Sequence, residues 1–157
     1  METNDTDRTP GPSEHSTATD SRRKRASSPP RAEAIDLSAT YVHLEDGPNA
    51  RPVAVGPDFW ETIERRTDLA GGRLVLVFHN AADWPTWEMH PAGEEIVYLL
   101  SGTVDLVLAE TDGERVLALR PGQAVIVPRG VWHRGIVHAP GDTLHITRGE
   151  GTQNRPV

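Results

Sequence analysis

The sequence predicts an all-β protein, an antiparallel sandwich or barrel with one short helix, on three observations. After residue 72 the apolar runs are short, and each ends at a turn-forming sequence such as SG, TDG, RPG or APGD. Short strands at such regular spacing are typical of sandwiches and barrels. The one good helix signal is residues 56–72, where Pro57 suits the first helical position and Gly71 can close the end.

The expected strands follow from the apolar runs between these turns. Residues 103–119 predict a β-hairpin with Asp112 and Gly113 at its tip, because an Asp-Gly pair between two apolar runs favours a tight turn. In chain order we expect strands over 34–37, 40–44, 51–55, 73–80, 94–100, 103–110, 114–119, 124–128, 133–138 and 143–147.

Composition divides the chain into a tail and one domain. Residues 1–33 are rich in Ser, Thr, Pro and charge and nearly free of large apolar residues, so burial cannot offset their ordering entropy and we predict a disordered tail. We interpret its basic run, Arg22–Arg25, as solvated charge, with an anchor for an anionic partner or a localisation signal as the alternative. Residues 34–157 are predicted to be a single domain with a core barrel over about 72–148, because 157 residues are too few for two ordinary domains.

Charge and cysteine content narrow the classes of partner and chemistry. Residues 1–33 carry six acidic and six basic side chains, so the whole net charge of -7 falls on the domain. An acidic domain is a poor match for nucleic acid or an anionic membrane. Without a run of 18 apolar residues or an apolar N-terminal stretch, we expect a cytoplasmic protein with no nucleic-acid or membrane partner. The chain has no cysteine, so a metal would have to be held by His, Asp, Glu or water.

Carboxylates and a histidine gather in the segment WEMHPAGEE, residues 87–95. Side chains alternate along a strand, so Glu88 and His90 project to the same side if this segment is extended. Glu95 begins the next strand on the face of Val97, which points it into the core, where an unpaired charge is costly. Buried carboxylates are usually paired or metal-bound, so Glu95 needs a partner.

A second cluster lies in PGQAVIVPRGVWH, residues 121–133. Gly122 permits a tight turn into the strand, Pro128 stops ladder pairing and Gly130 permits another bend. His133 emerges directly after this rigid corner, which predicts a deliberately positioned side chain.

The two clusters resemble the two motifs of the cupin family, G-x5-H-x-H-x(3,4)-E-x6-G and G-x5-P-x-G-x2-H-x3-N. The second motif fits at every position through its histidine, at Gly122, Pro128, Gly130 and His133. The first fits from its second histidine onward, at His90, Glu95 and Gly102. The resemblance covers about residues 50–150. The chain departs from the motifs at three points: Glu88 replaces the first histidine, the leading glycine is absent, and Val137 replaces the final asparagine.

By this resemblance we expect a single-domain cupin β-barrel, an antiparallel jelly roll, with a metal site inside. His90, Glu95 and His133 would be metal ligands, with Glu88 in the place of the fourth. Two histidines and a carboxylate suit a divalent ion such as Fe, Mn, Ni or Zn. A metal-free jelly roll is the alternative.

Glu88 has three open roles at this stage. It could ligate the metal, or act as a catalytic acid or base beside a metal-bound water. It could also form an ordinary ion pair, with Arg129 or Arg134 as the candidate partners.

The resemblance implies a small organic molecule as substrate, with oxygenase, isomerase or lyase chemistry, and a dioxygenase-like reaction if the protein is an enzyme. A non-catalytic ligand-binding or sensing cupin, with an absent or structural metal, is the alternative. Apolar residues on both faces of 94–102 favour a homodimer, an arrangement common in the family. The remaining candidates for the pocket are weaker, because strand histidines and tryptophans more often have packing roles; they are His79, His138, His145, Trp84, Trp87 and Trp132.

Overall fold

The computed structural model describes residues 31–157. The predicted disordered tail lies outside the described residues except for its last three, and so does the basic run at 22–25. Residues Glu33–Val157 form one compact unit, which contains every described strand and helix. No helix in this unit is long and apolar enough to cross a membrane.

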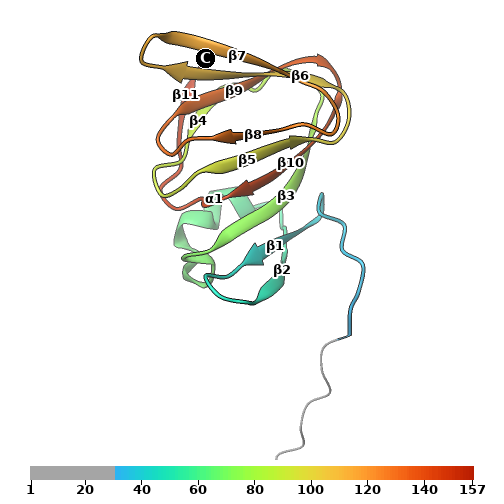
Figure 1. Ribbon diagram of the computed structural model, residues 1–157. Helices are drawn as coiled ribbons and strands as arrows, with labels where there is room; N and C mark the ends of the chain where they lie inside the picture. The colour runs from blue at the N-terminus through green and yellow to red at the C-terminus, as the bar shows by residue number, and fades with distance from the viewer. Residues whose placement is uncertain (1–30) are drawn as a thin grey trace, which may run out of the picture. The chain divides into compact units, whose positions relative to one another are not determined.

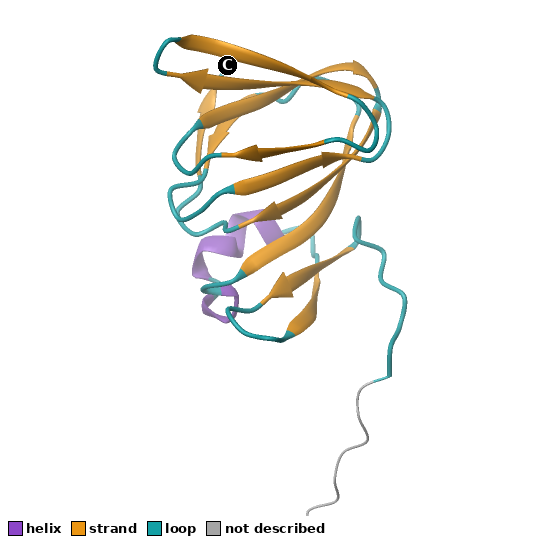
Figure 2. Cartoon of the chain, viewed as in Figure 1, coloured by secondary structure: helices purple, strands orange, loops and turns teal. Residues whose placement is uncertain are grey.

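Two antiparallel sheets make up this unit, so the predicted all-β class is confirmed (Figures 1 and 2). The first sheet has the order β2 (Ala50–Ala54), β1 (Thr40–Leu44), β3 (Arg73–Asn80), β10 (Gly141–Thr147), β5 (Glu95–Leu99) and β8 (Ala124–Val127). The second has the order β11 (Gln153–Pro156), β4 (Thr86–Met89), β9 (Trp132–Ala139), β6 (Thr103–Glu110) and β7 (Gly113–Leu119). Most neighbouring strands are far apart in the chain, as the jelly-roll expectation requires.

The predicted helix over 56–72 is wrong in its length. The α-helix α1 covers only Phe59–Thr62, and the 3-10 turns η1 (Ile63–Arg65) and η2 (Thr67–Leu69) follow it. No side chain caps its start, and the Thr62 hydroxyl bonds back to the carbonyl of Asp58, an arrangement that weakens a helix. Instead, the buried side chains of Phe59 and Leu69 hold this segment by packing against apolar residues of the first sheet.

Three strand expectations also differ from the structure, and the first concerns β4, which forms although no strand was expected over residues 86–89. Residues 34–37 form no strand. Strand β11 was not predicted, because its sequence QNRP contains no apolar residue and all four residues are exposed. It pairs with β4 through backbone hydrogen bonds, which leave no hydrophobic pattern in the sequence.

The core between the sheets fixes which side chains point inward. In β5 the inward residues are Glu95, Val97 and Leu99, all buried, while Glu94 is exposed, as the strand alternation predicted. A second apolar cluster packs α1 against the first sheet, and Phe59 meets Tyr41 edge to face with ring centroids 5.2 Å apart. Glu95 is thus held at one end of a strand whose other inward residues are core.

Candidate metal centre

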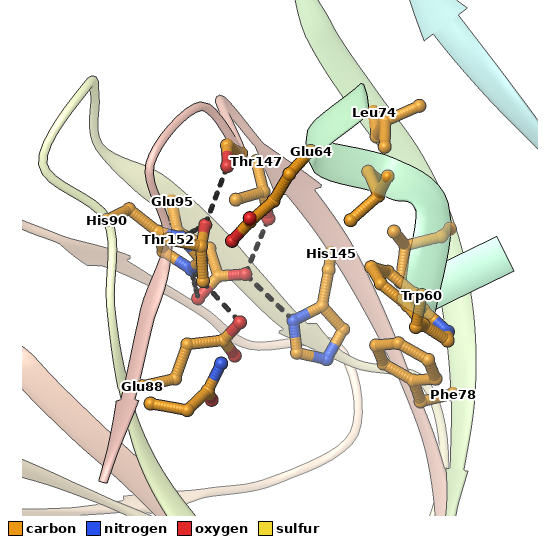
Figure 3. Close-up of a pocket in the computed structure, with 14 residues that line it drawn as sticks. Trp60, Glu64, Leu74, Phe78, Glu88, His90, Glu95, His145, Thr147 and Thr152 are labelled. Atoms are coloured by element: carbon orange, nitrogen blue, oxygen red, sulfur yellow. Dashed lines mark hydrogen bonds and ion pairs between the residues drawn. The ribbon is translucent and has the colours of Figure 1, made fainter. Parts of the chain in front are cut away.

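Both sheets contribute to the predicted site. Glu88 of β4 and His133 of β9 are directly paired across the second sheet, and His90 follows β4 by one residue. Glu95 begins β5 of the first sheet. Figure 3 shows Glu88, His90 and Glu95 converging on one side of a cavity. The jelly roll therefore brings the two sequence clusters together.

The distances within this group are short. Glu95 Oε2 lies 2.7 Å from His133 Nε2 and 3.5 Å from His90 Nε2. Glu88 Oε1 lies 3.9 Å from His90 Nε2. One potential ligand atom each of Glu88, His90 and His133 fall within 4.8 Å of one another. All four side chains predicted from the sequence are therefore neighbours.

Three buried atoms of this group have no hydrogen-bond partner among the described residues: His90 Nε2, Glu95 Oε2 and His133 Nε2. The side chains are 4%, 2% and 0% exposed. Glu95 Oε2 and His133 Nε2 approach each other, but without the direction that a hydrogen bond requires. Unpaired buried polar atoms are costly, so three that converge on one point suit the binding of a cation.

The other ring nitrogens set the histidine tautomers. His133 Nδ1 lies 3.2 Å from the carbonyl of Val131, to which it can only donate. His90 Nδ1 lies 2.8 Å from Thr152 Oγ1, whose own proton is donated to the carbonyl of Gly149. Both Nδ1 atoms therefore carry the proton in the neutral rings, and both Nε2 lone pairs face the centre. This is the arrangement in which histidine ligates a metal.

Glu95 is oriented through its other oxygen. Glu95 Oε1 accepts a hydrogen bond of 2.6 Å from Thr147 Oγ1 and lies 3.1 Å from His145 Nδ1. Thr143, His145 and Thr147 are the inward residues of β10, and Thr147 lies opposite Glu95 in the ladder. Because Oε1 is occupied in this way, Oε2 is the oxygen left for the centre.

A chain of hydrogen bonds leads away from His145. The ionised Glu95 can only accept, so His145 Nδ1 carries the proton, and Nε2 of the neutral ring accepts from Thr143 Oγ1, 2.8 Å away. Thr143 in turn accepts from Asn80 Nδ2 at 2.8 Å, and Asn80 Oδ1 accepts from Trp84 Nε1 at 2.8 Å. From the sequence, His145 was only a weak candidate for the pocket. The alternating T-x-H-x-T of β10 could have indicated three polar side chains on one inward face.

The pKa values of the two carboxylates, Glu88 and Glu95, shift in opposite directions. Burial tends to raise the pKa of Glu95, but contacts with His133, His145 and His90 outweigh it and hold that pKa well below its usual value. Burial, aided by the charge of Glu95, raises the pKa of Glu88. Burial alone would lower the pKa of His133, yet its contact with Glu95 raises it. One acid is thus firmly ionised while its neighbour binds a proton more readily.

Glu88 has no ion pair with Arg129 or Arg134 within residues 31–157. The guanidinium of Arg134 lies over Trp87 instead, 5.1 Å from the ring centroid. The structure therefore does not support the simple ion-pair role, and Glu88 faces the centre.

The remaining sequence candidates lie away from the cavity or pack beside it. His79 and His138 form exposed pairs with aspartates, each at 2.8 Å. Trp132 lies under the guanidinium of Arg155, 4.4 Å away, and Trp84 packs so closely on Gly135 that a Cβ there would come within 2.7 Å of the indole. These contacts agree with the packing roles preferred for the tryptophans.

A cavity of about 360 Å³ opens beside the centre (Figure 3). Glu88, His90 and Glu95 line one side, and Trp60 and Phe78 form an aromatic wall on the other. Neither aromatic residue was singled out for the pocket from the sequence. Both residues lie outside the two sequence motifs, so the motifs gave no reason to expect them at the pocket.

These pKa shifts predict how the stability of the metal-free protein depends on pH. Stability from His133, whose pKa is raised, is fully present below about pH 6.5 and lost as the pH rises through the folded-state pKa. Ionisation of Glu88 acts in the same direction, and the Glu95 contribution is lost only in stronger acid. We expect the melting temperature of the metal-free protein to fall from about pH 6 to about pH 8. The Glu95→Gln variant should show a flatter profile, and a rising wild-type profile would contradict the assignment.

Comparison with known proteins bears on the family of the chain. Residues 75–147 match the family model described as a cupin domain. No curated protein sequence matches the chain. Similar solved structures include a protein of Neisseria meningitidis (20% identity, 48% of this chain, 72% of that chain, TM-score 0.42) and a cupin-2 domain protein of Shewanella frigidimarina (16%, 48%, 69%, 0.42).

Oxalate decarboxylase of Bacillus subtilis is a further similar structure, at 18% identity over 54% of this chain, with a TM-score of 0.43. The match spans only 23% of the oxalate decarboxylase chain. Family model, two-sheet architecture and sequence motifs agree over the same region. Residues 75–147 of this protein therefore form a cupin domain.

Proposed function

We propose that this protein is a small metal-dependent cupin that binds a divalent cation through His90, Glu95 and His133. A small organic molecule would bind in the adjoining cavity. The observation that carries the proposal is the convergence of three buried atoms that have no hydrogen-bond partner within residues 31–157. The tautomers of both histidines, set by Val131 and Thr152, support it because they aim lone pairs at one point.

The donor set fits a divalent ion such as Fe, Mn, Ni or Zn, since it combines two imidazole nitrogens with a carboxylate oxygen. When bound, such an ion would supply Lewis acidity toward a molecule in its open positions. The carboxylates of Glu88 and Glu95 together would neutralise its charge. Thr147 and His145 would keep Glu95 in one orientation, and the aromatic wall would exclude bulk water.

We further propose Glu88 as the acid or base of the site. Its side chain lines the cavity, and burial raises its pKa toward the neutral range, so that it can hold or release a proton next to a bound molecule. Direct ligation of the ion by Glu88 is the competing role, and the experiment below separates the two. The fold does not select among oxygenase, isomerase and lyase reactions.

A non-catalytic ligand-binding or sensing cupin is the second candidate. It is favoured by the 2.7 Å approach of His133 Nε2 to Glu95 Oε2, because this ion pair compensates the buried charge in a metal-free barrel. In that case the metal would be absent or structural.

Elemental analysis of purified variants tests the metal site. We expect about one divalent ion per chain in the wild type, and its loss in His133→Ala and Glu95→Gln, because each removes a ligand. Glu94→Gln is the matched control: it changes the neighbouring, exposed carboxylate and should keep the metal. Loss in Glu88→Gln makes Glu88 a ligand, whereas retention assigns it the acid–base role. A wild type without metal, and without a gain in melting temperature on adding one, refutes the proposal.

We propose a homodimer formed by the outer face of the first sheet. Two rows of apolar side chains cross that face from strand to strand, as the register defines: Val75, Ile146, Ile96, Ile126 and Val77, Leu144, Tyr98, Ala124. Ile126 is 61% exposed. An apolar sheet face of this kind is normally covered, and a second copy of the chain would cover it symmetrically.

Sedimentation or light scattering tests the dimer. We expect twice the mass of one chain for the wild type and a single-chain mass for Ile126→Lys, since a buried unpaired charge opposes association. Val116→Lys is the control, because Val116 is 55% exposed but lies on the edge strand of the other sheet. A monomeric wild type, or a dimer unaffected by Ile126→Lys, rejects this face as the interface.

We also propose a cytoplasmic protein without nucleic-acid or membrane partners. The acidic balance of residues 34–157 supports this. Recovery of the native protein in a membrane or nucleic-acid fraction would contradict it.

A further inference from the structure

The lining of the cavity beside the candidate metal centre includes three acids and two aromatic rings, and among residues 31–157 no Lys or Arg lines it. Its acidic residues are Glu64, Glu88 and Glu95. An adjoining hollow shares Trp60 and Glu88 with it and adds Asp83, again with no Lys or Arg among its lining residues. Anionic small molecules are usually recognised by Arg, Lys or helix N-termini, so this lining disfavours a carboxylate or phosphate as ligand.

One helical segment contributes both an aromatic ring and a carboxylate to the lining of the cavity. Trp60 and Glu64 are four residues apart along α1 and η1, and both line the cavity. Trp60 is 49% exposed, although Tyr41 and Phe78 hold it, each with ring centroids 5.7 Å away. Glu64 has no ion pair within the described part of the chain. Figure 3 shows the Glu64 carboxylate toward Glu95 and Thr152, across the cavity from Trp60 and Phe78. A molecule that spans the cavity can therefore pair an ammonium group with Glu64 and lay an apolar ring on the aromatic wall.

A bound divalent ion would leave the cavity and the adjoining hollow with a negative net charge. Glu88 and Glu95 would neutralise the ion, and the charges of Glu64 and Asp83 would remain. Arg65 follows Glu64 directly in the sequence but lines neither hollow. Arg66 is paired with Asp68 at 2.7 Å, and together with Arg73 it lines a third hollow that shares Glu64 with the cavity.

Polar side chains inside the cavity can anchor a ligand. Glu88 and Asn154 line the cavity beside the proposed metal ligands. The space of about 360 Å³ lies within the range of small-molecule sites. Polar groups at one end and an aromatic wall toward the mouth favour a molecule with a flat apolar body.

We infer that the cavity takes a small aromatic amine in its cationic form. The ring lies against Trp60 and Phe78, and the ammonium group points to the carboxylate side of the cavity, where it pairs with Glu64. This inference rests on the proposed function only in using the same cavity as the ligand site. It does not depend on which reaction, if any, takes place there.

Calorimetric titration with three matched probes tests the inference. The probes are 2-phenylethylamine, neutral 2-phenylethanol and anionic 3-phenylpropanoate, titrated into the full chain with and without bound metal. We expect the amine to bind roughly tenfold or more tightly than the carboxylate, since ion-pair and cation–π attraction favour only the amine. Glu64→Gln should reduce this preference several-fold and leave the affinity for the alcohol unchanged. Glu61→Gln, an exposed acid of the same helix that does not line the cavity, should change neither.

The outcomes separate this inference from the proposed function. Equal or tighter binding of 3-phenylpropanoate, no effect of Glu64→Gln, or binding of none of the probes at millimolar concentration overturns the amine assignment, whatever the metal content. A protein that contains no metal but prefers the amine loses the metal-dependent function and keeps the amine site. Trp60→Ala should weaken the amine and the alcohol alike, which confirms that the ring lies on the aromatic wall.

Discussion

The burial of the Glu95 carboxylate is the constraint on which the rest of the site depends. A carboxylate that is 2% exposed cannot be left without compensation, because transferring a charge out of water is costly. One oxygen is held by Thr147 and His145, and the other faces His90 and His133. The pKa of Glu95 is well below its usual value despite burial, so the surrounding donors outweigh the desolvation cost.

The barrel supplies these partners from distant parts of the chain. β10 lies between β3 and β5, which places His145 and Thr147 next to Glu95, and β4 lies against β9, which pairs Glu88 with His133. The same closure leaves a cavity between the centre and the aromatic wall of α1 and β3. The proposed metal ligands, the acid–base candidate and the cavity thus follow from one topology.

Sequence reasoning predicted the parts of the site that follow local periodicity. Strand alternation and motif spacing both selected Glu95 over Glu94, and the burial of β5 agrees. Contacts between segments that are remote in the chain were harder to predict, because no local pattern records them. His145 was therefore only a weak candidate for the pocket, and Trp60 was not a candidate at all. The helix itself was overpredicted, since its Pro and Gly signals mark boundaries but cannot show that tertiary packing keeps only four residues α-helical.

The most direct test of the metal site is an anomalous difference map. It would be calculated from diffraction data collected at the absorption edge of the metal, on crystals of the metal-loaded protein. We expect one peak that lies about 2.0–2.3 Å from each of His90 Nε2, His133 Nε2 and Glu95 Oε2, with Thr147 and His145 still bound to the other oxygen of Glu95. A peak elsewhere would contradict it. So would a map without a peak in which His133 and Glu95 are joined by a well-directed hydrogen bond, because the buried atoms would then be partners of one another and not ligands of a metal.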